Sequence, residues 1–366
     1  MPKILHTSDW HLGIESWIGS KSTDRLEELK VALNFLVEKA KEEKVDLILI
    51  TGDVLHNRVS PRLEALNLLA DILAKFASLA PTIVVLGNHD WQGLKAWKNL
   101  KVKNLFIVDE PVVEPLQIGN FNIFAIPYID VQRLLEFHDN LARAKDFLNW
   151  FFEEVRQKIN PYKLNIVAGH LMVEGSIESE RENHIEVEIK TTVVPTGIDY
   201  VALGHIHHQG QLSVNPTVCY CGSPIIFDFG EEKESKGALI VDFEGSQKRI
   251  LEIKTPCKKL KTFYLSDYSA KTIDKLSDEL KSFEGYARLV FDAPESNEVR
   301  RYFMDNFECV RKVVFKNEYD STSILTQIKK LDLLDMYKQF IKGRFEGFED
   351  KMIQTVEEIL KEVEEL

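Results

Sequence analysis

The fold is decided by the stretch KILHTSDWH, residues 3–11. Its apolar first half predicts a strand over Lys3–Thr7, and Asp9 and His11 follow where that strand ends. A second stretch, DLILITGDVLH over residues 46–56, is apolar on consecutive positions, as a strand covered on both faces would be. It also ends in an aspartate and a histidine. We therefore expect an α/β protein whose buried strands carry polar side chains at their ends.

Apolar runs alternate with helical periodicity as far as residue 255, which is typical of a layered α/β domain. Helices are predicted over residues 24–44, 61–77 and 140–158, and the second has Ser60 at its N-cap and Pro61 in its first position. Strands are also predicted over residues 82–86, 119–126, 164–168, 200–203, 237–242 and 250–253. Residues 1–255 are therefore expected to form the larger domain.

The pattern changes after Thr255-Pro256. Residues 262–316 alternate strand, helix, strand, helix and strand, which predicts a small α+β unit. After a polar linker, residues 323–366 form two amphipathic helical segments that need an apolar surface to cover them. One interpretation is a hairpin of these segments on each other, and the other is docking on a second protein.

The composition narrows the class of protein. The 366 residues include 46 Lys and Arg against 58 Asp and Glu, a formal charge of −12. This balance argues against a protein that coats polyanions through bulk charge, although it leaves room for a local basic groove. The four cysteines form no CxxC pair, and neither a secretory leader nor a membrane span is apparent. We expect a protein of the reducing cytoplasm with no membrane partner.

Histidines and short polar residues follow five of the expected strands. They are Asp9 and His11, then Asp53 and His56, then Asn88, His89 and Asp90, then His170, and finally His205 and His207. The carboxyl ends of strands in an open α/β sheet meet at one crevice, so we expect these side chains to lie together. A single histidine at a strand end is more often a satisfied polar residue than a ligand. Five such ends in order favour a metal centre.

The expected ligands also suggest a chemistry. Carboxylates and imidazoles without a thiolate suit Mn²⁺, Fe²⁺ or Zn²⁺. They are too many for one ion, and two ions sharing a carboxylate would use them all. Two such ions are the usual device for hydrolysing phosphate esters, because they activate water at neutral pH. The glycines at positions 52, 87, 169 and 204 are expected to let the backbone turn close to the ions.

Five motifs carry a resemblance to a known family: HTSDWHLG, VDLILITGDVLH, GNHD, GHIHH and YCGSPIIFDFGEEKESKG. Together they resemble the calcineurin-like metallophosphoesterase superfamily, and within it the DNA repair nuclease subunits of the SbcD and meiotic-recombination-eleven type. The resemblance covers residues 3–242. It implies a metallophosphoesterase β-sandwich flanked by helices, a DNA-binding capping domain over 262–316 and C-terminal helices over 323–366. Cys219 and Cys221 fall in the last motif, and we expect them to pack in the core.

The resemblance also implies a role for each site residue. One ion would be held by Asp9, His11, Asp53 and His207, and the other by Asp53, Asn88, His170 and His205. Asp53 would therefore bridge the two ions. In the family, the residue at His89 protonates the leaving oxygen or stabilises charge in the transition state. Asp90 would orient the ring of His89, and His56 would position the phosphate or the strand.

The activity implied by the resemblance is manganese-dependent DNA cleavage in double-strand break repair, with two Mn²⁺ ions, or Fe²⁺, Zn²⁺ or Mg²⁺ in their place. The family acts as an exonuclease on duplex ends and as an endonuclease on single strands. Its partners are DNA, a second copy of itself, and a coiled-coil ATPase of the SbcC or radiation-fifty type that binds the C-terminal helices. Two alternatives are a phosphatase or cyclic-nucleotide phosphodiesterase with the same metals, and a non-catalytic DNA-end scaffold.

The predicted helix over residues 61–77 has apolar side chains around a wide arc. Burial under neighbouring parts of the same chain explains this arc as well as a homodimer does. In the homodimer that the resemblance implies, Leu66 and Leu69 of this helix would lie in the interface with Leu94 and Trp97.

Overall fold

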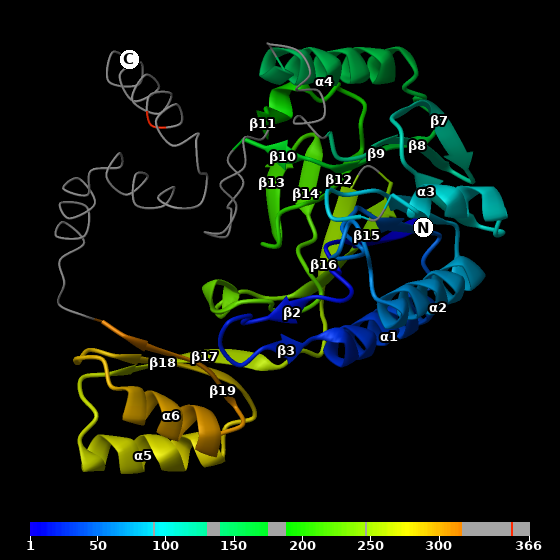
Figure 1. Cartoon of the computed structure of the whole chain (residues 1–366). Coiled ribbons are helices and arrows are strands. Elements are labelled where there is room, and N and C mark those ends of the chain that lie inside the picture. Colours follow the sequence, from blue (N-terminus) through cyan, green and yellow to red (C-terminus); the bar gives the residue numbers. More distant parts are fainter. Residues whose placement is uncertain (91, 130–139, 175–187, 246, 317–352, 354–366) are drawn as a thin grey trace.

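The computed structural model describes residues 1–90, 92–129, 140–174, 188–245 and 247–316, together with residue 353 (Figure 1). The segment 323–366, where two helices are expected, lies outside the described residues except for residue 353. The described part of the chain forms a larger domain and a smaller unit below it in the view of Figure 1.

The first sheet of the larger domain has six strands in the order β16-β15-β1-β4-β5-β6. Their bounds are β1 Lys3–Thr7, β4 Leu47–Ile50, β5 Thr82–Val85, β6 Leu105–Val108, β15 Gly237–Glu244 and β16 Gln247–Lys254. Strands β1, β4, β5 and β6 are parallel to one another. On the other side of β1, strand β15 pairs antiparallel with β1, and β16 pairs antiparallel with β15.

The second sheet also has six strands, in the order β13-β14-β12-β9-β8-β7. Their bounds are β7 Val112–Ile118, β8 Phe121–Ile126, β9 Leu164–His170, β12 Tyr200–Gly204, β13 Gly210–Val214 and β14 Thr217–Tyr220. The central strands β8, β9, β12 and β14 are parallel. The sequence pattern missed β7 and β13, which are edge strands with polar residues that interrupt the apolar run. It also missed the four-residue strands β6 and β14, although β14 is buried.

The two sheets pack face to face, and helices cover their outer faces. Helices α1 (Leu26–Glu43) and α2 (Leu63–Leu79) cover the first sheet, and α4 (Asn140–Gln157) covers the second. Strand β4 shows why its sequence is continuously apolar, since Leu49 points into the core between the sheets and Ile48 into the core beneath the helices. This arrangement confirms the expected β-sandwich flanked by helices. Cys219 and Cys221 pack between the sheets, as expected.

Helix α2 begins later than its sequence predicts. It starts at Leu63 instead of Pro61, and Arg62 takes the N-cap position in an extended conformation. The side chain of Asn57 accepts hydrogen bonds from the backbone N–H groups of Val59 and Ser60, at 3.0 and 2.8 Å. Ser60 is therefore held in a loop and cannot cap the helix, so the expected N-cap is wrong.

The wide apolar arc of α2 is covered largely within one chain. Leu69 of this helix and Leu94, in the short helix α3 (Leu94–Trp97), are buried in the core beneath α1 and α2. Leu66 and Trp97 are partly buried against the same core. Burial by the chain itself therefore explains most of the arc, and substitutions at Leu69 or Leu94 would disturb the core in addition to any interface.

The smaller unit follows the predicted order of elements. Its bounds are β17 Lys259–Leu265, α5 Ala270–Lys281, β18 Gly285–Phe291, α6 Asn297–Asn306 and β19 Val310–Phe315. The three strands form a parallel sheet with a core of its own. Strand β17 begins at Lys259, before the expected start at residue 262, because its pairing with β18 extends to Gly285. Within the described residues, no helix has both the length and the apolar character needed to cross a bilayer.

The remaining described elements are short connections. They are β2 Glu15–Ser16, β3 Thr23–Asp24, β10 Met172–Val173, β11 Glu188–Ile189, and the 3-10 turns η1 Lys98–Leu100, η3 Thr191–Val193 and η4 Phe229–Glu231. The turn η4 lies between the two domains, where Phe229 packs in a small cluster with Trp17 and Tyr286.

Candidate metal centre

The polar residues predicted at the strand ends come from both sheets. Asp9, Asp53 and Asn88 follow β1, β4 and β5 of the first sheet, whereas His170 ends β9 and His205 follows β12 of the second. The expectation of a single open sheet is therefore replaced by two sheets whose carboxyl ends face one another. Within the first sheet, backbone hydrogen bonds join the loop after β1 to the loop after β4. The backbone N–H of Asp9 donates to the carbonyl of Gly52 at 3.0 Å, and that of His11 donates to the carbonyl of Asp53 at 2.9 Å.

Three groups of side chains are close enough to hold a metal ion. They are Asp9, His11 and His207, then Asp9, Asp53 and His170, and finally His11, His56 and His89. Within each group the ligand atoms lie within 4.8 Å of one another. The structure thus brings together most of the ligands predicted from the sequence, although Asp9, and not only Asp53, contacts both halves of the centre.

Asp53 lies between the two halves of the centre. Its Oδ2 atom is 3.6 Å from Nε2 of His11 and 3.6 Å from Nε2 of His170. Its Oδ1 atom accepts a hydrogen bond from the backbone N–H of His89 at 2.8 Å. This position is compatible with a carboxylate that bridges two ions.

The two remaining predicted ligands stand beside these groups. The side-chain oxygen of Asn88 lies 2.9 Å from Nε2 of His170. The ring of His205 lies 5.0 Å from that of His170, and its backbone N–H contacts both carboxylate oxygens of Asp9 at 3.1 Å. All seven predicted ligands therefore surround one region.

Hydrogen bonds to the outer ring nitrogens fix which nitrogen of a histidine faces the centre. The Nδ1 atom of His170 lies 2.7 Å from the carbonyl oxygen of Thr51, so Nδ1–H donates there and Nε2 presents its lone pair inward. The Nδ1 atom of His207 lies 3.0 Å from Oε1 of Glu231 and is fixed in the same way. Nε2 of His207 then lies 3.0 Å from Nε2 of His11.

The donor set fits divalent cations. Asp9 and Asp53 are both buried, and among the described residues no lysine or arginine pairs with either. Buried carboxylates of this kind require a cation or a proton, and burial raises the pKa of Asp9. Burial and the surrounding imidazoles hold the pKa of His11 well below 6.5, which leaves this imidazole neutral and able to act as a ligand.

The backbone at the centre is strained. Asp9, His11, Asp53 and His205 have φ values of 53°, 45°, 51° and 101°, in the left-handed region that residues with a Cβ atom avoid. Such strain is concentrated at functional sites, where the surrounding structure imposes it. Four expected ligands thus hold conformations that local sequence alone would disfavour.

Two glycines allow the chain to pass close to the ligands. A Cβ atom on Gly52, whose φ is +100°, would lie 2.2 Å from Nδ1 of His170. A Cβ atom on Gly87 would lie 2.2 Å from Oδ1 of Asp53. No side chain fits at either position, as expected from the sequence for glycines next to the ions.

His89 and His56 form one face of the centre. Their rings are stacked, with centroids 5.4 Å apart, and Nδ1 of His89 lies 3.1 Å from the carbonyl oxygen of His56. His89 therefore donates Nδ1–H to that carbonyl and keeps Nε2 for another partner. The ring is oriented by the backbone of the loop after β4.

Asp90 is expected to orient the ring of His89, but its two carboxylate oxygens bond to the backbone. Its carboxylate is buried and accepts hydrogen bonds from the backbone N–H groups of Gly87, at 2.8 Å, and Leu55, at 3.0 Å. Asp90 thus fastens the loop after β5 to the loop after β4. Burial, together with the nearby charge of Asp53, raises the pKa of Asp90 to about 7.

One residue that contacts the centre was missed. Glu231, whose side chain is buried, bonds to the ring of His207 across 24 positions of sequence. It lies in a run of acids and lysines, EEKESK, that looks like a solvated loop. No local pattern distinguishes it from Glu232 or Glu234, so only the tertiary structure identifies it.

A two-sheet sandwich with aspartates and histidines gathered at its strand ends defines a metal-dependent phosphoesterase. The model of the calcineurin-like phosphoesterase family matches residues 2–209, and the chain belongs to that family.

Two curated relatives are more specific. The chain is 31% identical over 298 residues to the SbcD subunit of the nuclease SbcCD from Staphylococcus saprophyticus, covering 78% of this chain and 76% of that one. It is 27% identical over 359 residues to the SbcD subunit of the nuclease SbcCD from Staphylococcus epidermidis, covering 93% of both. These similarities confirm the resemblance to SbcD-type subunits. A solved dimetal phosphatase from Danio rerio is also similar, with a TM-score of 0.40 and 12% identity, covering 66% of this chain and 92% of that one.

Proposed function

We propose that this chain is the nuclease subunit of an SbcCD-type complex and hydrolyses DNA phosphodiesters with two divalent ions, foremost Mn²⁺. The observation that carries the proposal is the gathering of the seven predicted oxygen and nitrogen ligands, Asp53 among them, in a chain similar over 93% of its length to the SbcD subunit of a nuclease SbcCD. When bound, the ions supply an activated water molecule and neutralise charge on the phosphate.

Each side chain of the centre has a separate role in the proposed reaction. Asp9, His11, Asp53 and His207 hold one ion, and Asp53, Asn88, His170 and His205 hold the other. His89, with Nδ1–H fixed on the carbonyl of His56, acts in its doubly protonated form, in which Nε2–H donates a proton or a hydrogen bond to the leaving oxygen. His56 stacks on that ring and positions the phosphate. Asp90 holds the loop that carries Asn88 and His89.

The substrate range follows the family resemblance. The proposed activity is exonucleolytic on duplex ends and endonucleolytic on single strands, in double-strand break repair in the cytoplasm. The capping unit supplies DNA contacts. Residues 323–366, which apart from residue 353 lie outside the described part of the chain, dock on an SbcC-type coiled-coil ATPase.

The test uses the full chain and end-labelled oligonucleotides. We expect cleavage that requires added Mn²⁺, loss of cleavage and of bound metal in Asp53→Ala, and cleavage slower by about 10²- to 10⁴-fold with metal retained in His89→Ser. His208→Ala is the matched control, since His208 lies on the same loop as His207 but belongs to none of the three metal groups. Parallel reactions with Fe²⁺, Zn²⁺ and Mg²⁺ rank the ions.

Three outcomes contradict the proposal. Cleavage of a small aryl phosphodiester with every oligonucleotide left intact would indicate a phosphatase or cyclic-nucleotide phosphodiesterase. Metal-independent DNA binding without cleavage in any variant would indicate a scaffold. Full activity in Asp53→Ala would show that cleavage does not depend on the proposed metal centre.

We also propose a homodimer, with the exposed start of α2 at its interface. Leu63, the first residue of α2, is 66% exposed, and Val59 in the preceding loop is 84% exposed, so a second copy of the chain has apolar surface to cover here. Sedimentation equilibrium should give two chains per particle for the wild type and one for Leu63→Glu. A monomeric wild type would exclude the dimer.

A further inference from the structure

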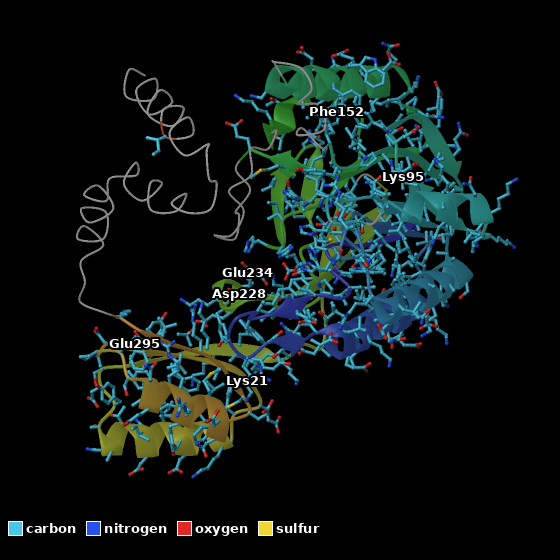
Figure 2. The ribbon with its side chains drawn as sticks, viewed as in Figure 1. Lys21, Lys95, Phe152, Asp228, Glu234 and Glu295 are labelled. Carbon is cyan, nitrogen blue, oxygen red and sulfur yellow. The ribbon has the colours of Figure 1, made fainter. Side chains whose placement is uncertain are left out.

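The segment Asp228–Gly237 lies against His207, and the function of one of its residues is not explained by the proposed activity. Figure 2 labels Asp228 and Glu234, which mark this segment at the boundary between the larger domain and the capping unit. Between them, Glu231 is only 3% exposed, and its Oε1 atom accepts a hydrogen bond from Nδ1–H of His207 at 3.0 Å.

The second oxygen of Glu231 is also fully engaged. Oε2 accepts from the backbone N–H of Phe227 at 2.9 Å and lies 3.2 Å from Nζ of Lys236. Lys236 is itself buried, and its Nζ donates to the backbone carbonyl of His207 at 2.9 Å. One short segment therefore holds both the ring and the main chain of His207.

A ligand histidine needs such an arrangement. A neutral imidazole has two tautomers, and only the one with its proton on Nδ1 leaves Nε2 free to bind a metal ion. A carboxylate that accepts Nδ1–H selects this tautomer, fixes the ring plane and makes Nε2 a stronger donor. Nε2 of His207 is the atom that joins Asp9 and His11 in the first metal group.

We propose that Glu231 is a positioning residue that holds His207 in its metal-binding tautomer, with Lys236 balancing the buried charge. The inference rests on the proposed metal centre. It predicts that Glu231 strengthens the binding of only one ion, the one held by Asp9, His11 and His207. The affinity for the ion held by His170 and its neighbours should not depend on Glu231.

Replacement by glutamine separates this role from space filling. The glutamine side chain in Glu231→Gln has the size of the glutamate, but its two ends differ, with one carbonyl oxygen and one amide group. Phe227 N–H and Lys236 Nζ both donate toward one end, so the oxygen is drawn there and the amide N–H turns toward His207. The amide then favours the tautomer with its proton on Nε2, which cannot bind the ion.

The experiment is a titration of the metal-free full chain with Mn²⁺ as the probe, followed by electron paramagnetic resonance of the free ion. We expect two binding steps for the wild type, and in Glu231→Gln one of them weakened by about 10- to 100-fold. The matched control is Glu234→Gln, since Glu234 contacts the same lysine at 2.8 Å but not the ring of His207. It should bind both ions as the wild type does.

Each other outcome is decisive. Wild-type affinity for both ions in Glu231→Gln overturns the inference while leaving the metal centre intact. Equal losses in Glu231→Gln and Glu234→Gln assign the effect to loop charge and also overturn it. A wild type that binds no Mn²⁺ contradicts the proposed function, and the inference falls with it. Thermal melts without metal confirm that each variant is folded, and ¹⁵N-histidine spectra report the His207 tautomer directly.

Discussion

At the scale of single residues, the centre combines strained backbone with close contacts between two glycines and ligand side chains. The left-handed conformation of Asp9, His11 and Asp53 costs about 1–3 kcal/mol at each residue. Backbone hydrogen bonds from the loop after β1 to the loop after β4 offset this cost and fix the ligand positions. The glycines contribute by being small, because a ligand occupies the space that a Cβ atom would need.

Gly87→Ala tests this contact. Its Cβ atom would lie 2.2 Å from Oδ1 of Asp53 and 2.5 Å from the backbone N of Asp53. We expect a loss of about 1–3 kcal/mol in the free energy of unfolding, measured in urea, and weaker Mn²⁺ binding because Asp53 is displaced. Gly210→Ala is the control, since its Cβ atom would lie 3.7 Å from its nearest neighbour in His208. Equal stability of the two variants would argue against a crowded centre.

At the scale of elements, the sequence predicts the positions of buried strands better than the starts of helices. The buried strands β4 and β5 lie where the apolar runs predict, because both their faces are covered and the pattern has little ambiguity. The buried strand β14 was missed, because its four residues are too few for a clear pattern. Helix starts were less predictable, because a capping residue competes with other local hydrogen bonds. Ser60 is an example, because its backbone N–H bonds to the side chain of Asn57 in a loop before the helix. Ser296, in contrast, does cap α6.

Helices α5 and α6 of the smaller unit offer a matched pair for measuring the effect of an N-cap. Oγ of Ser296 accepts from the backbone N–H of Val299 at 3.3 Å, whereas Ser269 at the start of α5 makes no such cap bond. Ser296→Ala should lower the free energy of unfolding by about 1 kcal/mol. Ser269→Ala should stay within about 0.5 kcal/mol of the wild type. Urea denaturation followed by circular dichroism checks both, and a larger effect at Ser269 would contradict the assignment.

At the scale of the whole molecule, the two domains are joined by a buried polar cluster. Arg25 of the larger domain is fully buried, donates to Glu28 at 2.9 and 3.0 Å, and packs on the ring of Tyr286 from the smaller unit. Tyr286 also donates its hydroxyl to Glu28 at 2.5 Å. A second link joins Thr262 of β17 to Glu232, next to the proposed positioning residue Glu231.

Stability in acid should depend on Glu28. Burial would raise the pKa of its carboxyl, but the hydrogen bonds and charge of Arg25 outweigh burial and hold it below 4.5. The stabilisation is therefore fully present above pH 4.5 and is lost as the pH falls through the lower, folded-state pKa. We expect Glu28→Gln to cost about 2 kcal/mol at pH 7, measured by urea denaturation, with a difference that shrinks below pH 4.5. A difference that stays constant, or grows in acid, would contradict the sign.

The sequence by itself determined most of the buried strands, the kinds of ligand and their spacing along each strand end. These features depend on residues that are near one another in the chain, where hydrophobic periodicity and short motifs are informative. The resemblance of five motifs extended this to a family, which the family model and the two SbcD relatives confirm.

Only the tertiary structure decided how the strand ends meet. His11 and His207 are 196 positions apart, and their contact depends on two separate sheets that pack face to face. The partners of Asp90 and Glu231 were likewise set by packing, because a buried carboxylate takes whichever donors the fold places beside it. Sequence patterns encode the direction of a side chain on its own element, whereas the partner across the core depends on how all the elements pack together.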